Sequence, residues 1–269
     1  MVPLKVSFVK CSSALSRTGI NGVDFVLNPY TGCEHGCVYC YATFMKRYSG
    51  HREEWGEFVD VKSNMPHLLR KETRKAAGKK ILLSSVTDPY QPCEKEFEIT
   101  RNCLSVLSGK GIEVSLLTKS PLLLRDMDLL SEVRVGMTVT TINDEVSRMF
   151  EPRASPPSER FSALEKLRNE NVKTYAFFGP ILPYFSDTEG EMEAVFRRLQ
   201  SAGVEYVIVD RLNFRGGVLA RIAGMLAQRH PELVEAYREI HANSEGYGAS
   251  LKEKVLSAMP QGLDTEILF

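Results

Sequence analysis

Three cysteines stand close together in the stretch from Asn28 to Ala42, which reads NPYTGCEHGCVYCYA. Cys33, Cys37 and Cys40 fall within eight residues, and the glycines and proline around them keep the backbone out of regular structure. Thiolates that converge from a loop are ligands for soft metal centres, chiefly iron–sulfur clusters and zinc. Three protein ligands rather than four leave one metal position open for water, substrate or a cofactor. The sequence therefore predicts an open metal centre held by these three cysteines.

Two alternatives use a fourth ligand. A zinc site would take His35, but structural zinc sites prefer ligands two to four residues apart, and only one residue separates His35 from Cys33. Such a protein would be a zinc-stabilised nucleic-acid-binding module. A cluster that serves only electron transfer would need a further cysteine, and the three candidates are scattered, as buried apolar thiols are. They are Cys11, Cys93 and Cys103.

Composition describes an ordinary globular chain with a full core. Of its 269 residues, 43% are hydrophobic and 25% are charged, and 34 basic residues balance 34 acidic ones. Zero net charge provides no general attraction to nucleic acid or to an anionic membrane. The start of the chain lacks the pattern of a secretory signal, and no apolar run reaches the roughly 18 residues of a membrane span. We expect a cytoplasmic protein with no membrane partner, whose crowded thiols bind metal rather than form disulfides.

The elements that must position these thiols alternate between strand and helix. Six apolar strand patterns are separated by helical stretches, which predicts repeated βαβ units, a parallel sheet and helices outside it. The predicted strands are Val23–Leu27, Ile81–Val86, Glu113–Thr118, Val133–Val139, Lys173–Phe178 and Glu205–Val209. Residues 1–22 have no clear period and form an N-terminal lead-in, residues 23–214 form the core, and residues 215–269 read as a purely helical C-terminal extension.

Helix signals agree with this division. Asn64, Ser120 and Ser155 are predicted N-caps, and Ser186 or Asp187 opens the helix with the clearest apolar stripe, which ends at Gly203. A first helix is predicted over residues 41–48. Residues 53–64, which contain the single tryptophan, read as a polar excursion.

Polar side chains follow the predicted strands where each one ends. Because ligand-contacting groups gather at the carboxyl ends of parallel strands, these side chains are candidates for one shared site. They are Ser84, Ser85, Thr87, Asp88, Lys119, Thr140, Thr141, Asn143, Asp210 and Asn213, and the fifth strand ends in Gly179 and Pro180. Each could alternatively be a turn-forming residue.

The cysteine spacing Cys33-x3-Cys37-x2-Cys40, with Tyr39 before the last cysteine, resembles the cluster motif of the radical S-adenosylmethionine (SAM) superfamily. The stretch from Thr87 to Pro92 and the stretch Thr118–Ser120 extend the resemblance to the branch related to spore photoproduct lyase. Together the matches cover roughly the first two hundred residues.

This resemblance implies a partial (β/α)6 TIM-like barrel with a C-terminal helical extension. It also implies a [4Fe–4S] cluster whose open iron takes the amine and carboxylate of SAM. One electron, from a reductant such as flavodoxin or ferredoxin, would cleave SAM to methionine and a 5′-deoxyadenosyl radical that abstracts hydrogen from a substrate.

The resemblance also assigns cofactor contacts, with Tyr39 among them. Ser85 and Lys119 would hold the amino-acid end of SAM, and Thr140 and Thr141 its ribose or carboxylate. Arg153 would supply a second cation, or else pair with Glu151. Pro180 would line the adenine. Asp88, Tyr90 and Glu94 would either position the cofactor or contact the substrate.

One departure of this sequence from the spore photoproduct lyase pattern bears on the substrate. Spore photoproduct lyase has a cysteine hydrogen donor at the position where this chain has Ser84, and a serine O–H is a far poorer hydrogen-atom donor than a thiol. Cys93 lies nearby in sequence and is the alternative donor. The substrate therefore stays open: nucleic-acid lesion repair and the modification of another macromolecule are both candidates.

Overall fold

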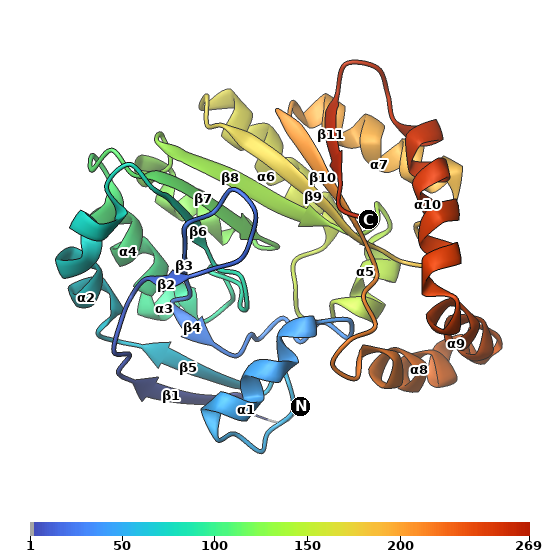
Figure 1. The fold of residues 1–269 in the computed structure, drawn as a ribbon, viewed down its shortest axis with the longest axis horizontal. Coiled ribbons are helices and arrows are strands. Elements are labelled where there is room, and N and C mark those ends of the chain that lie inside the picture. The colour runs from blue at the N-terminus through green and yellow to red at the C-terminus, as the bar shows by residue number, and fades with distance from the viewer. Residues whose placement is uncertain (1–2) are drawn as a thin grey trace.

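An open, eight-stranded sheet forms the centre of the computed structural model, which describes residues 3–269 (Figure 1). Six strands are parallel neighbours in chain order, as predicted. They are β3 (Phe25–Leu27), β6 (Lys80–Leu83), β7 (Glu113–Thr118), β8 (Val133–Val139), β9 (Thr174–Ile181) and β10 (Tyr206–Arg211). The edges are β2 (Ser16–Arg17), antiparallel to β3, and β11 (Asp264–Ile267), parallel to β10. The edges do not pair, so the predicted partial (β/α)6 barrel is confirmed.

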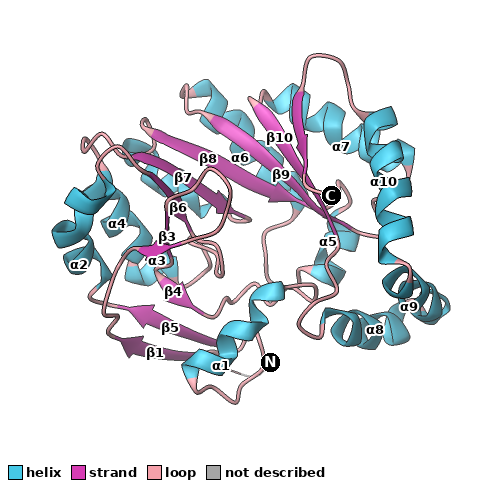
Figure 2. Ribbon diagram, viewed as in Figure 1, coloured by secondary structure: helices cyan, strands magenta, loops and turns pink. Residues whose placement is uncertain are grey.

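Helices line the outside of this sheet in one continuous layer, in which each helix contacts the next (Figure 2). In order they are α2 (Met65–Glu72), α4 (Ile99–Leu107), the 3-10 helix η3 (Pro121–Leu129), α6 (Pro157–Asn169), α7 (Glu189–Ala202) and α10 (Ser244–Ala258). Helix α7 shows why they pack: Met192, Val195, Phe196 and Leu199 form the predicted stripe and are fully buried. The helix ends at Gly203, whose φ of +77° is the left-handed conformation that glycine adopts readily.

Several predicted helix starts need correction. Thr188, rather than Ser186 or Asp187, caps α7, because the Ser186 hydroxyl already accepts the Leu182 N–H at 2.8 Å. Ser155 caps nothing, since Pro156 is the N-cap of α6. Ser120 does accept the Leu122 N–H, but the segment that it opens is a 3-10 helix. The helix predicted over residues 41–48 divides into η1 (Tyr41–Met45) and α1 (Lys46–Ser49). The remaining short helices of the core are η2 (Thr73–Ala76), α3 (Glu94–Phe97) and α5 (Asp144–Phe150).

A second, three-stranded sheet departs from the sequence prediction. It consists of β1 (Lys5–Val9), β5 (Phe58–Lys62) and β4 (Tyr30–Thr31), with β5 in the middle. The period-free lead-in and the polar excursion thus each contribute a strand. Asp60 interrupts the apolar pattern of β5, yet it is buried because His51 Nε2 lies 2.8 Å from its carboxylate. Asn64 lies at the N-cap of α2 as predicted, but its side chain bonds the Cys11 backbone instead of the helix.

The C-terminal residues form α8 (Val218–Arg229), η4 (Pro231–Leu233), α9 (Val234–Ala242) and α10 before β11. A purely helical extension is therefore wrong at its end, where Asp264–Ile267 pairs with β10. The alternating polar residues of this strand suit a sheet edge. No helix within residues 3–269 is long and apolar enough to cross a membrane.

Candidate functional site

The three clustered cysteines lie on a loop, residues 32–40, that we call the cysteine loop. It joins β4 to η1 and lies against the residues that follow β6. The Thr87 hydroxyl donates to the Gly32 carbonyl at 2.5 Å, and the Gln91 carboxamide accepts the Glu34 N–H at 2.8 Å. Just before the loop, the Asn28 side chain accepts the Ser85 N–H at 2.9 Å. The motif after β6 thus fixes the start of the loop.

The last residue of α5 and the residues that follow it hold the opposite side of the loop. Phe150 accepts the Val38 N–H at 2.8 Å, and the Arg153 N–H donates to the His35 carbonyl at 3.3 Å. The Arg153 guanidinium donates to the Gly56 carbonyl, where a Cβ on Gly56 would lie 2.9 Å from the Gly36 Cα. Arg153 therefore supports the backbone of the cysteine loop in this structure, whatever further contact it makes with a ligand.

The thiols of the loop are free, and burial raises the pKa of each. Cys33 and Cys37 are buried, and Cys40 is partly exposed. Burial raises the pKa of Cys37 to about 12; it also raises the pKa of Cys33, where the Asp88 carboxylate and then the neighbouring thiols add to the rise. Across residues 3–269, no three His, Cys, Asp or Glu side chains are gathered at metal-binding distances. The assignment of these three cysteines as ligands therefore stays a prediction from the motif.

His35 lies beside Asp88. Its Nδ1 lies 3.4 Å from the Asp88 carboxylate, and burial lowers the pKa of the imidazole. Asp88 also accepts the Thr118 hydroxyl at 2.6 Å, the Lys119 N–H at 2.8 Å and the Tyr90 N–H at 2.9 Å. Asp88 thus joins the cysteine loop to the end of β7, and the Nδ1 atom of His35 faces the Asp88 carboxylate.

A buried ion pair that the sequence did not reveal lies behind the loop. Glu151 accepts hydrogen bonds from the Tyr39 hydroxyl, from Ser147 Oγ at 3.0 Å and from Arg160 Nη2. Both members of the Glu151–Arg160 pair are almost completely buried. Burial alone would raise the pKa of Glu151, but Arg160 and then Lys119 hold it below its ordinary value. Arg160 also donates to the Thr138 carbonyl at 3.0 Å, so the pair ties Tyr39 to β8.

Lys119 lies at the end of β7 with its Nζ 5.7 Å from the centre of the Tyr39 ring. Burial disfavours the charged ammonium, but Cys37 and Glu151 raise the pKa of Lys119 above its ordinary value. Among the described residues, its Nζ makes no ion pair with a carboxylate. A largely buried cation of this kind is suited to an anionic ligand.

Two buried hydroxyls, at the ends of the two strands that flank β7, also have no partner in the described chain. Ser84 Oγ follows β6, and Thr140 Oγ1 follows β8. Ser84 has a φ of +70°, which ends the predicted strand Ile81–Val86 early, at Leu83. Buried hydroxyls normally find a partner, so this pair indicates a site that receives a polar ligand. Thr141, in contrast, accepts the Asn143 N–H at 3.0 Å, and Pro180 lies within β9.

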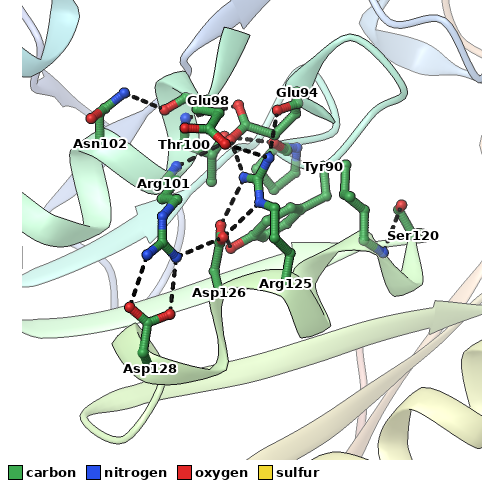
Figure 3. Close-up of polar contacts among 12 residues, drawn as sticks. Tyr90, Glu94, Glu98, Thr100, Arg101, Asn102, Ser120, Arg125, Asp126 and Asp128 are labelled. Carbon is green, nitrogen blue, oxygen red and sulfur yellow. Dashed lines mark hydrogen bonds and ion pairs between the residues drawn. The ribbon is translucent and has the colours of Figure 1, made fainter. Parts of the chain in front are cut away.

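Tyr90 and Glu94 belong to a separate, fully satisfied network on the helix side (Figure 3). Glu94 accepts the Thr100 N–H at 2.9 Å and Arg125 Nη2 at 2.9 Å. The Tyr90 hydroxyl donates to Asp126 at 3.1 Å, and Asp126 also pairs with the guanidinium of Arg125. Both side chains are completely buried, so the structure favours a supporting role for them over ligand contact.

The geometry, an open parallel barrel with a three-cysteine loop at the carboxyl edge of its strands, defines the class of protein. The sequence model of the radical SAM superfamily matches residues 27–209. The chain therefore belongs to the radical SAM superfamily. This membership implies a [4Fe–4S] cluster and SAM as its cofactors.

The chain is 39% identical over 189 residues to an uncharacterized protein of Methanocaldococcus jannaschii, covering 69% of this chain and 71% of that one. It is 28% identical over 264 residues to an uncharacterized protein of Mycobacterium tuberculosis, covering 92% and 78%. Among solved structures, a spore photoproduct lyase variant with bound AdoMet and a dinucleoside spore photoproduct has a TM-score of 0.74 at 14% identity, over 99% of this chain and 82% of that one. SuiB of Streptococcus suis, bound to S-adenosylmethionine, has a TM-score of 0.55 at 9% identity, over 100% and 51%. At 14% and 9% identity, the likeness to these two solved structures concerns the fold alone.

Proposed function

We propose that this protein is a radical SAM enzyme that binds a [4Fe–4S] cluster through Cys33, Cys37 and Cys40. SAM would occupy the strand ends beside the cysteine loop. When bound, these groups supply reductive cleavage of SAM to a 5′-deoxyadenosyl radical. The observation that carries the proposal is Lys119, a largely buried cation without a carboxylate partner that faces the aromatic ring of the cysteine loop.

The donor set fits this cofactor pair. Three thiolates leave one iron without a protein ligand, and the amine and carboxylate of SAM can chelate it. The Lys119 ammonium would bind the SAM carboxylate, and the unpartnered hydroxyls of Ser84 and Thr140 would serve its polar groups. We propose Ser85, Thr141, Arg153 and Pro180 as further contacts. Of these, Ser85 already donates its N–H to the Asn28 side chain, and the Arg153 guanidinium donates to the Gly56 carbonyl.

The substrate is proposed only as a molecule that yields a hydrogen atom to the radical. The fold is similar to that of spore photoproduct lyase, so nucleic acid is a candidate. Ser84, however, offers an O–H where that enzyme has a thiol, and the net charge is zero. Cys93 is no ready substitute, since its thiol is buried and Glu34 bonds its backbone N–H at 2.5 Å. We therefore propose that the radical abstracts hydrogen from the substrate. We do not propose a repair reaction that uses a thiol donor like that of spore photoproduct lyase. All six cysteines are free, which suits a reducing, cytoplasmic setting with flavodoxin or ferredoxin as reductant.

Anaerobic reconstitution with iron and sulfide tests the proposal. We expect a brown protein with about four irons and four sulfides per chain. Cys37→Ala should lose this content, while Cys103→Ala, which alters a buried thiol of the main core, should keep it. A colourless protein that takes up zinc would overturn the proposed function.

A further inference from the structure

Arg221 reaches the cysteine loop from the C-terminal helix α8, beyond the segment that matches the family. Its Nε donates to the Val38 carbonyl at 3.0 Å, and its Nη2 donates to the Cys40 carbonyl at 2.7 Å. The remaining nitrogen, Nη1, donates to the Gly216 carbonyl at 3.0 Å, just before the helix. One guanidinium thus holds the last turn of the cysteine loop and the start of α8 together. The rigid fork of arginine suits this geometry, and a lysine could not reproduce it.

The apolar side of α8 packs against the same loop. Val218, Ile222 and Leu226, spaced by four residues, are fully buried in a hydrophobic cluster distinct from the main core. Cys37 and Tyr39 belong to that cluster. Helix α8 therefore forms part of the wall around one proposed cluster ligand, Cys37, and Arg221 extends from this wall to the backbone of a second, Cys40.

The charge of Arg221 also has no carboxylate in ion-pair contact within residues 3–269. All its hydrogen bonds go to neutral carbonyl groups, and the side chain is only partly exposed. A half-buried cation that pairs only with carbonyls is suited to compensate a nearby anion. A [4Fe–4S] cluster held by three thiolates is such an anion, and reduction by one electron adds one more negative charge to it.

We propose that Arg221 is a positioning residue for the cluster: it clamps the Cys40 end of the cysteine loop, and its positive charge favours the reduced cluster. This inference rests on the proposed function. It makes the C-terminal extension a working part of the site, although α8 lies outside the segment matched by the family.

The experiment compares Arg221→Gln, Arg221→Lys and Arg229→Gln in the reconstituted full chain. Arg229 is a matched control, since it lies two turns further along the same helix and is exposed. The first readout is the midpoint potential of the cluster, measured by spectroscopy while dithionite supplies one electron and is itself oxidised. The second is the rate at which a chelator removes iron.

We expect Arg221→Gln to lower the equilibrium constant for reduction about tenfold, which is a potential about 59 mV more negative for a one-electron couple. Arg221→Lys should keep the potential near that of the wild type, because the charge remains, but should lose iron several-fold faster, because the fork is lost. Arg229→Gln should match the wild type in both readouts.

Equal potentials in Arg221→Gln and Arg229→Gln would overturn the proposal. If Arg221→Gln does not fold, the rate of iron loss from Arg221→Lys tests the proposal instead. A wild-type rate of iron loss in Arg221→Lys would overturn the proposal that Arg221 clamps the cysteine loop. Failure of the proposed function looks different, because then the wild-type protein itself assembles no four-iron cluster.

Discussion

The buried pair of Glu151 and Arg160 makes a sharp prediction about stability. Glu151→Gln keeps the shape of the side chain but removes the charge that Arg160 faces at almost zero exposure. Arg160 keeps its bonds to the carbonyls of Thr138 and Ser155, so it cannot simply move into solvent. The variant therefore leaves an uncompensated cation in the core.

Breaking one partner of such a pair costs about 3–5 kcal/mol, whereas an exposed pair contributes roughly 0–1 kcal/mol. A domain of this kind has about 5–15 kcal/mol of stability in total, so Glu151→Gln should remove a large part of it. The loss should also reach the cysteine loop, because Tyr39 donates its hydroxyl to the same carboxylate.

Urea unfolding of the metal-free protein measures the effect. Glu165→Gln is the control, because Glu165 forms an exposed pair with Arg198 at 2.6 Å and should lose less than about 1 kcal/mol. A double-mutant cycle with Arg160→Met completes the design. The double variant should be more stable than the sum of the single losses, by roughly 1–3 kcal/mol. Additive losses, or a Glu151→Gln variant as stable as the control, would refute this reasoning.

Three further predictions follow from the site. Folding lowers the pKa of Glu151, so the carboxylate contributes to folding stability above the unfolded value of about 4.3, and this contribution is lost as pH falls. The difference in unfolding free energy between wild type and Glu151→Gln should therefore narrow below about pH 4. A constant difference would contradict this. Lys119→Met should weaken SAM binding roughly tenfold to a hundredfold by calorimetry, whereas lost stability with normal SAM affinity would indicate a purely structural lysine. Cys11→Ala and Cys93→Ala should each retain about four irons per chain, and loss of the cluster in either would assign a fourth protein ligand.

Much of the fold could be predicted from the sequence because the barrel strands are apolar runs bounded by turn residues. Strands β1 and β5 could not be predicted, since their pairing joins segments that are distant in sequence. In addition, Asp60 interrupts the apolar pattern of β5, and only the structure shows that His51 is its partner. Strand β11 was missed because its alternating exposed residues give no apolar run.

The candidate site was predictable where residues cluster in sequence and not where folding brings them together. The cysteine spacing and the polar strand ends are local signals. Arg160 lies on a helix, and its burial is evident only once the buried face of α6 is known. Arg221 is separated from Cys40 by 181 residues, so no local pattern could connect them.

The central claim is that the three cysteines and the strand ends together support reductive cleavage of SAM. The most direct measurement is chromatography of the products after dithionite is added to the reconstituted protein and SAM under anaerobic conditions. The account predicts 5′-deoxyadenosine and methionine in equal amounts, with none formed by Cys37→Ala. A protein that carries four irons and yet forms no 5′-deoxyadenosine would contradict it.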